Sequence, residues 1–438
     1  MKKVLKWTGV VILTPFLLIV LLAVLLYIPP IQNWAVQKVA AYASEETGME
    51  ITVGHVHLAF PLDLSIEEAK AIENGEKRDT VLDVRQVIVD VQLLPLFGGQ
   101  VEVDALEFHQ LKLNTTHFIP DVRVKGFIDL LSVESHGIDL GGETVRVQKA
   151  ALADATVDVA LSDTVPPDTT ESENFWKIAV DNLDIQRTGV TVHMPGDTLR
   201  LGVYMGKTSA TEGSFDLGKG HYQLTKLDWT DGQFEYQALS TLPDKEKKPS
   251  GEGMDFNHIL LSNITLGIDS LDYCDPKLSV SLRACSFRER CGLQVDQLTG
   301  HIAMDSVALH LPDLELRTPE SSLSAAVDMD MNAFDEQHPG KMNIAVHGAF
   351  GKQDLLHFLA DMPADFRRQW PNYPLTVDGV VKGNMQKMHI AGLNIKLPTA
   401  FSITADGFAG NLTDTDHLYA NIDADKILDL AQKIVGDY

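Results

Sequence analysis

The sequence predicts a mostly β protein that a helix at its N-terminus tethers to a membrane. The segment Val10–Ile28 has no charged residue and follows Lys2, Lys3 and Lys6. From Ile51 onward, apolar and polar residues alternate with the period of two that is typical of β-strands. Helical spacing returns in only two later segments, so helices are too few to cover the strands. We therefore expect an N-terminal transmembrane helix, a short amphipathic helix, and then an elongated, curved antiparallel β-sheet, shaped like a groove or a taco, with a few short helices.

The apolar segment is long enough to cross a bilayer. As a helix, its 19 residues would extend about 28 Å, close to the thickness of the hydrocarbon core. A cleavable signal peptide would have a shorter apolar core and a small-x-small site, which the sequence lacks around Leu25–Pro30. Because basic residues stay on the cytoplasmic side, we expect residues 1–28 to form a cytoplasmic tip and an uncleaved anchor, with the body exported. The anchor residues are Val10, Leu17, Leu18, Leu21, Leu22 and Ile28.

Composition limits the partners of the exported body. The chain has 36 Lys and Arg against 61 Asp and Glu, a net charge of −25. Such an acidic protein would not neutralise phosphates, which argues against nucleic acid and against a body that lies along an anionic membrane. The three cysteines are too few for a disulfide scaffold. With residue 282 opposite residue 293 in a hairpin, Cys285 and Cys291 would point to opposite faces, so we expect no disulfide between them.

Helices are expected in three places after the anchor. Apolar residues recur at helical spacing between Ile31 and Ala43, and Gly48 stands where a C-terminal cap would. This first helix either caps the sheet just outside the membrane or packs as an ordinary core-facing helix. The same spacing predicts helices over residues 355–366 and 427–435.

The strand pattern predicts a sheet with one dry face. It is clearest in Leu323–Met331, where apolar residues occupy every second position. The dry face must be covered by a second sheet, as in a sandwich or barrel, or left open to a ligand. The length of the chain favours an elongated, repeat-like array over a compact sandwich. The positions that would contact a ligand, and that would be interior in a closed β core, are Val87, Val89, Val91, Leu323, Val327, Met329, Met331, Phe401 and Ile403.

No motif predicts catalysis, a bound metal or a cofactor. Asp328, Asp330 and Asn332 have the spacing of the start of a calcium loop, but the required glycine and the bidentate glutamate are absent. His55 and His57 share one side of a strand without a third ligand at a convincing spacing. An enzyme or carbohydrate-binding module would need a polar or aromatic pocket, and the five tryptophans are scattered. We therefore expect a protein that is not an enzyme.

Several segments together resemble the AsmA-like family. They are the anchor with its following helix, the strand Gly48–Val53, the run Val84–Gly99 with its Leu-Leu-Pro-Leu-Phe-Gly-Gly end, and the strand Leu106–Leu113. Their order is similar to the N-terminal region of TamB-type members, the inner-membrane part of the translocation and assembly module. The segment Pro374–Gly407 resembles the repeating unit of such proteins.

The resemblance implies a function without catalysis. Family members are anchored in the bacterial inner membrane and span the periplasm as long, curved sheets with an apolar groove. It implies a single-pass bridge protein that carries phospholipid along the groove toward the outer membrane. The alternative is a scaffold for translocation and assembly of outer-membrane proteins such as autotransporters. Its partner would be a BamA-like or TamA-like outer-membrane protein.

The resemblance also implies an order of parts along the chain. We expect residues 29–120 to form an AsmA-like or chorein-like cap with the first strands, and residues 121–438 to form β-groove repeats. The family's C-terminal domain, which would engage the outer-membrane partner, has no counterpart before Tyr438. We therefore expect the chain to be a fragment of a longer protein.

Overall fold

The computed structural model describes most of the chain between residues 37 and 425. The described residues are 37, 40–41, 44–45, 48–59, 63–73, 78–91, 103–115, 122–139, 143–162, 176–238, 253–335, 338–359, 362–412 and 417–425. The predicted anchor and the helix predicted over residues 427–435 lie outside them, so both stay predictions. The chain divides into two compact units, Met1–Thr170 with Asp184–Gly196 and Glu171–Leu183 with Asp197–Tyr438, and each is described by itself.

The first unit is an antiparallel sheet in which each strand pairs with its neighbour in sequence. The exception is at the start, where the first two short strands both pair with the third, one along each half of it. The strands are β1 (Met49–Thr52), β2 (His55–Ala59), β3 (Asp63–Glu73), β4 (Thr80–Val91), β5 (Val103–Asn114), β6 (Val122–Asp139) and β7 (Thr144–Leu161).

The helix predicted after the anchor is present in the described residues between 37 and 45, all of which are helical. The Ser44 hydroxyl accepts the backbone N–H of Ile51 at 2.9 Å, and the Ala40 side chain is buried. The helix therefore lies against β1.

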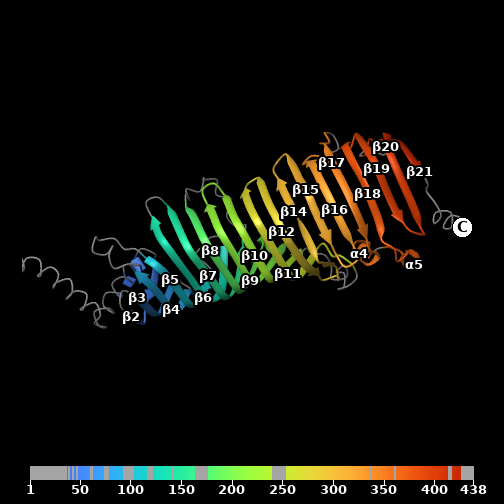
Figure 1. Cartoon of the computed structure of the whole chain (residues 1–438). Helices are drawn as coiled ribbons and strands as arrows, with labels where there is room; N and C mark the ends of the chain where they lie inside the picture. The colour runs from blue at the N-terminus through green and yellow to red at the C-terminus, as the bar shows by residue number, and fades with distance from the viewer. Residues whose placement is uncertain are drawn as a thin grey trace, which may run out of the picture. The chain divides into compact units, whose positions relative to one another are not determined.

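The second unit is a longer antiparallel sheet in which consecutive strands again pair, except that β12 pairs with both β13 and β14 (Figure 1). Among the described residues of this unit no pairing joins the last strand to the first, so the sheet is open. The strands are β9 (Leu199–Asp216), β10 (His221–Ala238), β11 (His258–Cys274), β12 (Lys277–Glu289), β13 (Gln294–Val295), β14 (Gln297–Met304), β15 (Ala308–Arg317), β16 (Ser322–Asp330), β17 (Met342–Phe350), β18 (Leu375–Asn384), β19 (Lys387–Leu397), β20 (Phe401–Gly410) and β21 (Tyr419–Asp425).

One further strand, β8 (Lys177–His193), contributes its first residues to the second unit and its last residues to the first. A 3-10 turn, η1 (Pro195–Asp197), follows it.

Two short helices, α4 (Lys352–Phe358) and α5 (Ala364–Gln369), stand between β17 and β18 and lie at one end of the strands (Figure 1). The sequence predicted helix over residues 355–366; the structure has two helices because Pro363 cannot continue the first one and instead precedes α5. The carboxylate of Asp354 accepts hydrogen bonds from the Thr318 and Ser321 hydroxyls, both at 2.5 Å. These bonds hold α4 against the β15–β16 turn.

The prediction of a mostly β chain with antiparallel pairing and few short helices is confirmed. The predicted register around the cysteines was wrong, because Leu282 lies opposite Gly300 rather than residue 293. The apolar run of β12 continues beyond Leu282, and its turn forms around Glu289, whose buried carboxylate accepts the backbone N–H of Cys291 at 2.5 Å. All three cysteines are free.

Candidate functional site: an apolar face in each unit

One face of the sheet in the second unit is apolar across the whole ladder. Residues directly opposite each other on paired strands point to the same face, so the register defines rows across the sheet. Met329 lies opposite Leu309 of β15 and Met342 of β17. Its row continues without a charged side chain, and with only two tyrosine hydroxyls, through Phe215, Tyr222, Tyr273, Leu278, Met304, Leu309, Met329, Met342, Gly383, Met388, Ala409 and Ala420.

Two more rows on the same face are equally apolar. Val327 lies opposite Leu311 and Ile344, and Leu323 lies opposite Leu316 and Gly348. Where a strand has a bulge, the apolar residues change from even to odd positions and stay on this face, as between Ile390 and Leu393 of β19. The rows are Leu311, Val327, Ile344, Val381, Ile390 and Gly407, then Leu298, Leu316, Leu323, Gly348, Val377, Ile395 and Ile403.

The structure therefore brings together six of the predicted positions on one sheet face. Four of them stand in the three rows: Leu323, Val327, Met329 and Ile403. Phe401 begins β20 opposite Leu397, and Met331 follows the last residue of β16.

The remaining three predicted positions are in the first unit. Val87 lies opposite Ile66 and Phe108, and Val89 lies opposite Leu64 and Leu106. Val91 pairs with Val103 after a shift of register, and its side chain lies outside the described residues. Val87 packs against a cluster whose buried members are Val84, Leu111, Ile128 and Ala155.

Sequence reasoning missed that Val84 and Val87 share a face although they are three residues apart. The same spacing recurs on five successive strands, in Ile66 and Ala69, Val84 and Val87, Phe108 and Leu111, Ile128 and Leu131, and Leu152 and Ala155. This repeated three-residue spacing of apolar residues is the signal in the sequence that could have predicted the shared face.

The change of spacing has a backbone cause. Side chains alternate strictly only while each residue is extended. On β3, β5 and β7, the residues Glu68, Gln110 and Asp154 have φ angles of 56°, 52° and 52°, in the left-handed region, between the two apolar residues of each pair. Each left-handed residue reorients its strand, so the apolar side chains on both sides of it reach one face.

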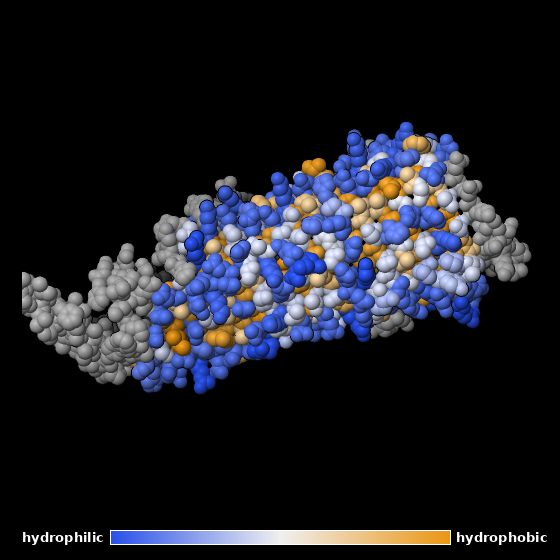
Figure 2. All heavy atoms as spheres, in the orientation of Figure 1, coloured by the Kyte–Doolittle hydropathy of each residue, from blue (hydrophilic) through white to orange (hydrophobic). Residues whose placement is uncertain are grey.

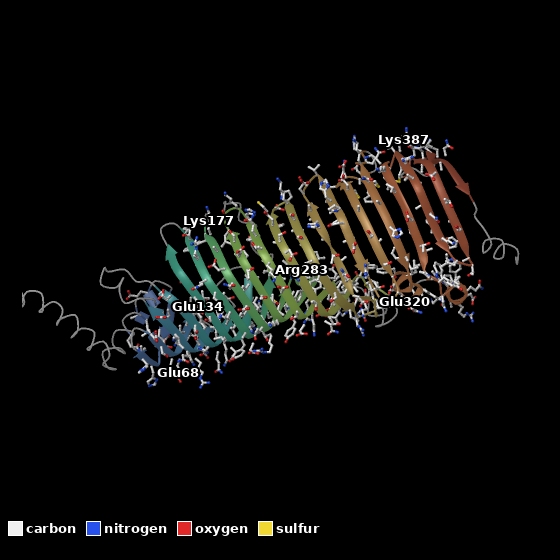
Figure 3. All side chains as sticks on the ribbon, viewed as in Figure 1. Glu68, Glu134, Lys177, Arg283, Glu320 and Lys387 are labelled. Atoms are coloured by element: carbon white, nitrogen blue, oxygen red, sulfur yellow. The ribbon has the colours of Figure 1, made fainter. Side chains whose placement is uncertain are left out.

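The opposite face of the second sheet is polar and carries His–Asp and Arg–Asp contacts between strands. The Asp328 carboxylate lies 2.8 Å from His310, and the Asp378 carboxylate lies 2.6 Å from His347. Arg283, labelled in Figure 3, bridges the carboxylates of Asp228 at 2.5 Å and of Asp269 at 2.8 Å. Its guanidinium holds the pKa of Asp228 below the ordinary value. The polar side chains of this face are therefore suited to contact with water.

The apolar rows are not covered as a closed core would be. Most of their large side chains are half-buried, and Tyr273 and Met304 are 36% and 38% exposed. Among the described residues, the largest fully buried side chains are only Leu397, Val84 and Thr188. Figure 2 shows hydrophobic side chains at the surface between hydrophilic ones over β14–β20. A facing sheet would close over such rows, so within the second unit the described part of the chain supplies no second layer.

Other features of the described residues do not indicate a functional site. No helix in that part of the chain is both long and apolar enough to span a membrane. It also holds no group of three His, Cys, Asp or Glu residues placed to bind a metal ion. A cavity of about 440 Å³ beside α4 is lined by Glu320, Lys352 and Tyr373, but the Lys352 ammonium already donates to the Trp370 carbonyl at 2.9 Å.

Comparison with known proteins adds no assignment. No protein-family model matches the sequence, and no curated protein matches it. The AsmA-like resemblance stays a prediction.

Proposed function

We propose that the protein is a bridge protein that holds the acyl chains of phospholipids on its apolar face. In this proposal it is anchored in the inner membrane, its body lies in the periplasm, and phospholipid moves along the sheet toward the outer membrane. The sheet would curve into a groove whose dry side is this face. The observation that carries the proposal is the row through Met329, which crosses the second sheet without a charged side chain and whose large side chains are mostly half-buried rather than closed over.

The energetics suit a track better than a fixed site. Burying one methylene is worth about 0.8 kcal/mol, so a chain of about 16 carbons would gain roughly 12 kcal/mol if fully covered. A face that covers one side of the chain supplies about half of that, roughly 6 kcal/mol. The rows offer methyl and methylene groups at every strand and no polar group at one preferred position. An acyl chain is therefore retained without being fixed.

Photo-crosslinking in cells tests the proposal with two positions on one strand. Val327 is on the apolar face, whereas Ser324 is exposed and lies opposite Glu315 and His347 on the polar face. The full chain, expressed in a bacterium with two membranes, would carry a benzophenone amino acid at either position. Mass spectrometry should find a phospholipid adduct at position 327 and none at 324. If position 327 gives no adduct, the proposed function fails.

A scaffold for protein assembly is the second candidate, and one observation favours it. Among the described residues, no strand pairs with the outer edge of β21, so this edge would accept an added client strand. Replacing Val327 and Met329 with glutamate charges the face and leaves the edge intact. Lipid transfer should then stop while assembly of outer-membrane proteins continues; loss of assembly alone would favour the scaffold.

A further inference from the structure

At the β14–β15 and β16–β17 turns the apolar face of the second sheet extends past the ends of its strands. Beyond the pair Leu309 and Met329, the Met331 N–H donates to the Val307 carbonyl at 2.8 Å, so these two residues form the next pair on the same face. Phe334 follows in the β16–β17 turn. Val307, Met331 and Phe334 are 66%, 51% and 62% exposed, and we name these three residues the collar.

The turn that presents Val307 is held by one side chain. The Asp305 carboxylate accepts the backbone N–H groups of Val307 at 2.8 Å and of Ala308 at 2.9 Å. The bonds to Ala308 and Val307 hold the pKa of Asp305 below its ordinary value, so the carboxylate is charged at neutral pH. Val307 is exposed because the turn places it there.

The turn that presents Phe334 is equally well ordered by hydrogen bonds. Asn332 donates its side-chain amide to the His338 carbonyl at 2.9 Å, and the Asp330 carboxylate accepts the Lys341 N–H at 2.8 Å. Ala333, directly before Phe334, is fully buried. Single exposed apolar residues are common, but three in adjoining turns that continue a larger apolar face indicate an interaction site.

Neighbouring hairpins at the same ends of the strands do not extend the face. The β11–β12 hairpin turns through Asp275 and Pro276. In the β18–β19 hairpin, the Asn384 side chain accepts the N–H groups of Gln386 and Lys387. The collar is therefore flanked by these two polar turns, and exposed apolar side chains recur further along the sheet, in Leu412 and Leu418 of the β20–β21 turn.

We propose that the collar is a lateral passage at which phospholipid acyl chains enter or leave the apolar face. The inference rests on the proposed function, and continuity with the face identifies the occupant. Docking of the collar on an anionic membrane is disfavoured because the carboxylates of Asp305, Asp330 and Asp335 stand in the same two turns. An acyl chain that crosses the collar needs only apolar contacts with its three side chains.

Crosslinking of the full chain in the same bacterium tests the passage. The benzophenone residue resembles phenylalanine and would replace Phe334; the matched control would replace Gln386, which is exposed at the tip of the β18–β19 hairpin. Phospholipid adducts should form at position 334 several-fold more than at position 386. If position 327 forms an adduct and position 334 does not, or position 334 captures only protein, the passage is refuted and the proposed function stands. If position 327 forms none, the proposed function itself fails.

A second variant tests whether lipid reaches the apolar face through the collar, rather than whether lipid is merely close to the collar. Phe334→Asp places a charge on a side chain that is 62% exposed, so folding should be unaffected. It should lower the lipid adduct at position 327 several-fold, whereas Gln386→Asp should not. Equal adduct at position 327 in both variants would overturn the passage.

Discussion

Replacing Met329 with glutamate separates an open apolar face from a closed β core. Met329 lies in its row between Leu309 and Met342, and its side chain is half-buried. Full burial of a methionine side chain is worth about 1.5–3 kcal/mol, so a half-buried one loses about 1 kcal/mol on replacement. On an uncovered face the new carboxylate reaches water, which limits its own cost to about 1 kcal/mol. We expect a total loss of about 1–2 kcal/mol in the free energy of unfolding.

In a closed core the same carboxylate would be buried without a partner and would cost several kcal/mol more. Far-UV circular dichroism during heating measures the difference. For a unit of about 150–250 residues the expected loss lowers Tm by roughly 2–8 °C. Ser324→Glu, on the exposed polar face of the same strand, should change stability by no more than about 0.5 kcal/mol. A Met329→Glu protein that does not fold, beside a folded Ser324→Glu protein, would refute the open face.

Three further predictions follow from particular residues. Burial and a hydrogen bond to Glu289 raise the pKa of Cys291 to about 11, so this thiol should stay unmodified by a maleimide at pH 7.5, and intact-mass spectrometry that finds it labelled in the folded protein would contradict its burial. The Asp313 carboxylate accepts the backbone N–H of His301 and contacts the His301 ring, and these bonds lower the pKa of Asp313. The stability that the Asp313 carboxylate contributes is present above its unfolded pKa near 4 and is lost as the pH falls through its folded pKa. The Tm difference between Asp313→Asn and the parent should therefore shrink on acidification from pH 7 to pH 3. Gln110→Val forces a β-branched residue into the left-handed region and should cost about 1–2 kcal/mol in a denaturant titration, whereas Gln110→Gly should cost less; equal effects would show that backbone strain is not the cause.

The sequence predicted the fold class and most of the candidate face because alternation is a property of a single strand. Leu323, Val327 and Met329 face one side as soon as their segment is extended, whatever lies beside it. The resemblance to a known family added an interpretation of that face. It did not add the face itself.

Features that depend on partner strands were not predicted. Val84 and Val87 share a face beside β3 and β5, whose left-handed residues are Glu68 and Gln110, and the register of Leu282 follows from a turn built around the buried Glu289. The alternation of apolar and polar residues does not indicate whether the dry face is covered, since the strands of a sandwich and of an open sheet have the same period. The collar was found only in part, because Val307 and Met331 continue the alternation of their strands while Phe334 lies in a turn.

The ladder of the second unit has a consequence for how such a chain changes in length. From β9 to β21 the strands contact chiefly their immediate neighbours, so no side chain far along the sequence must fit any given hairpin. Adding a hairpin would lengthen the sheet by two strand spacings, about 10 Å, and would extend every apolar row by two residues. Duplication or deletion of single hairpins is thus a simple route by which the length of this architecture can change.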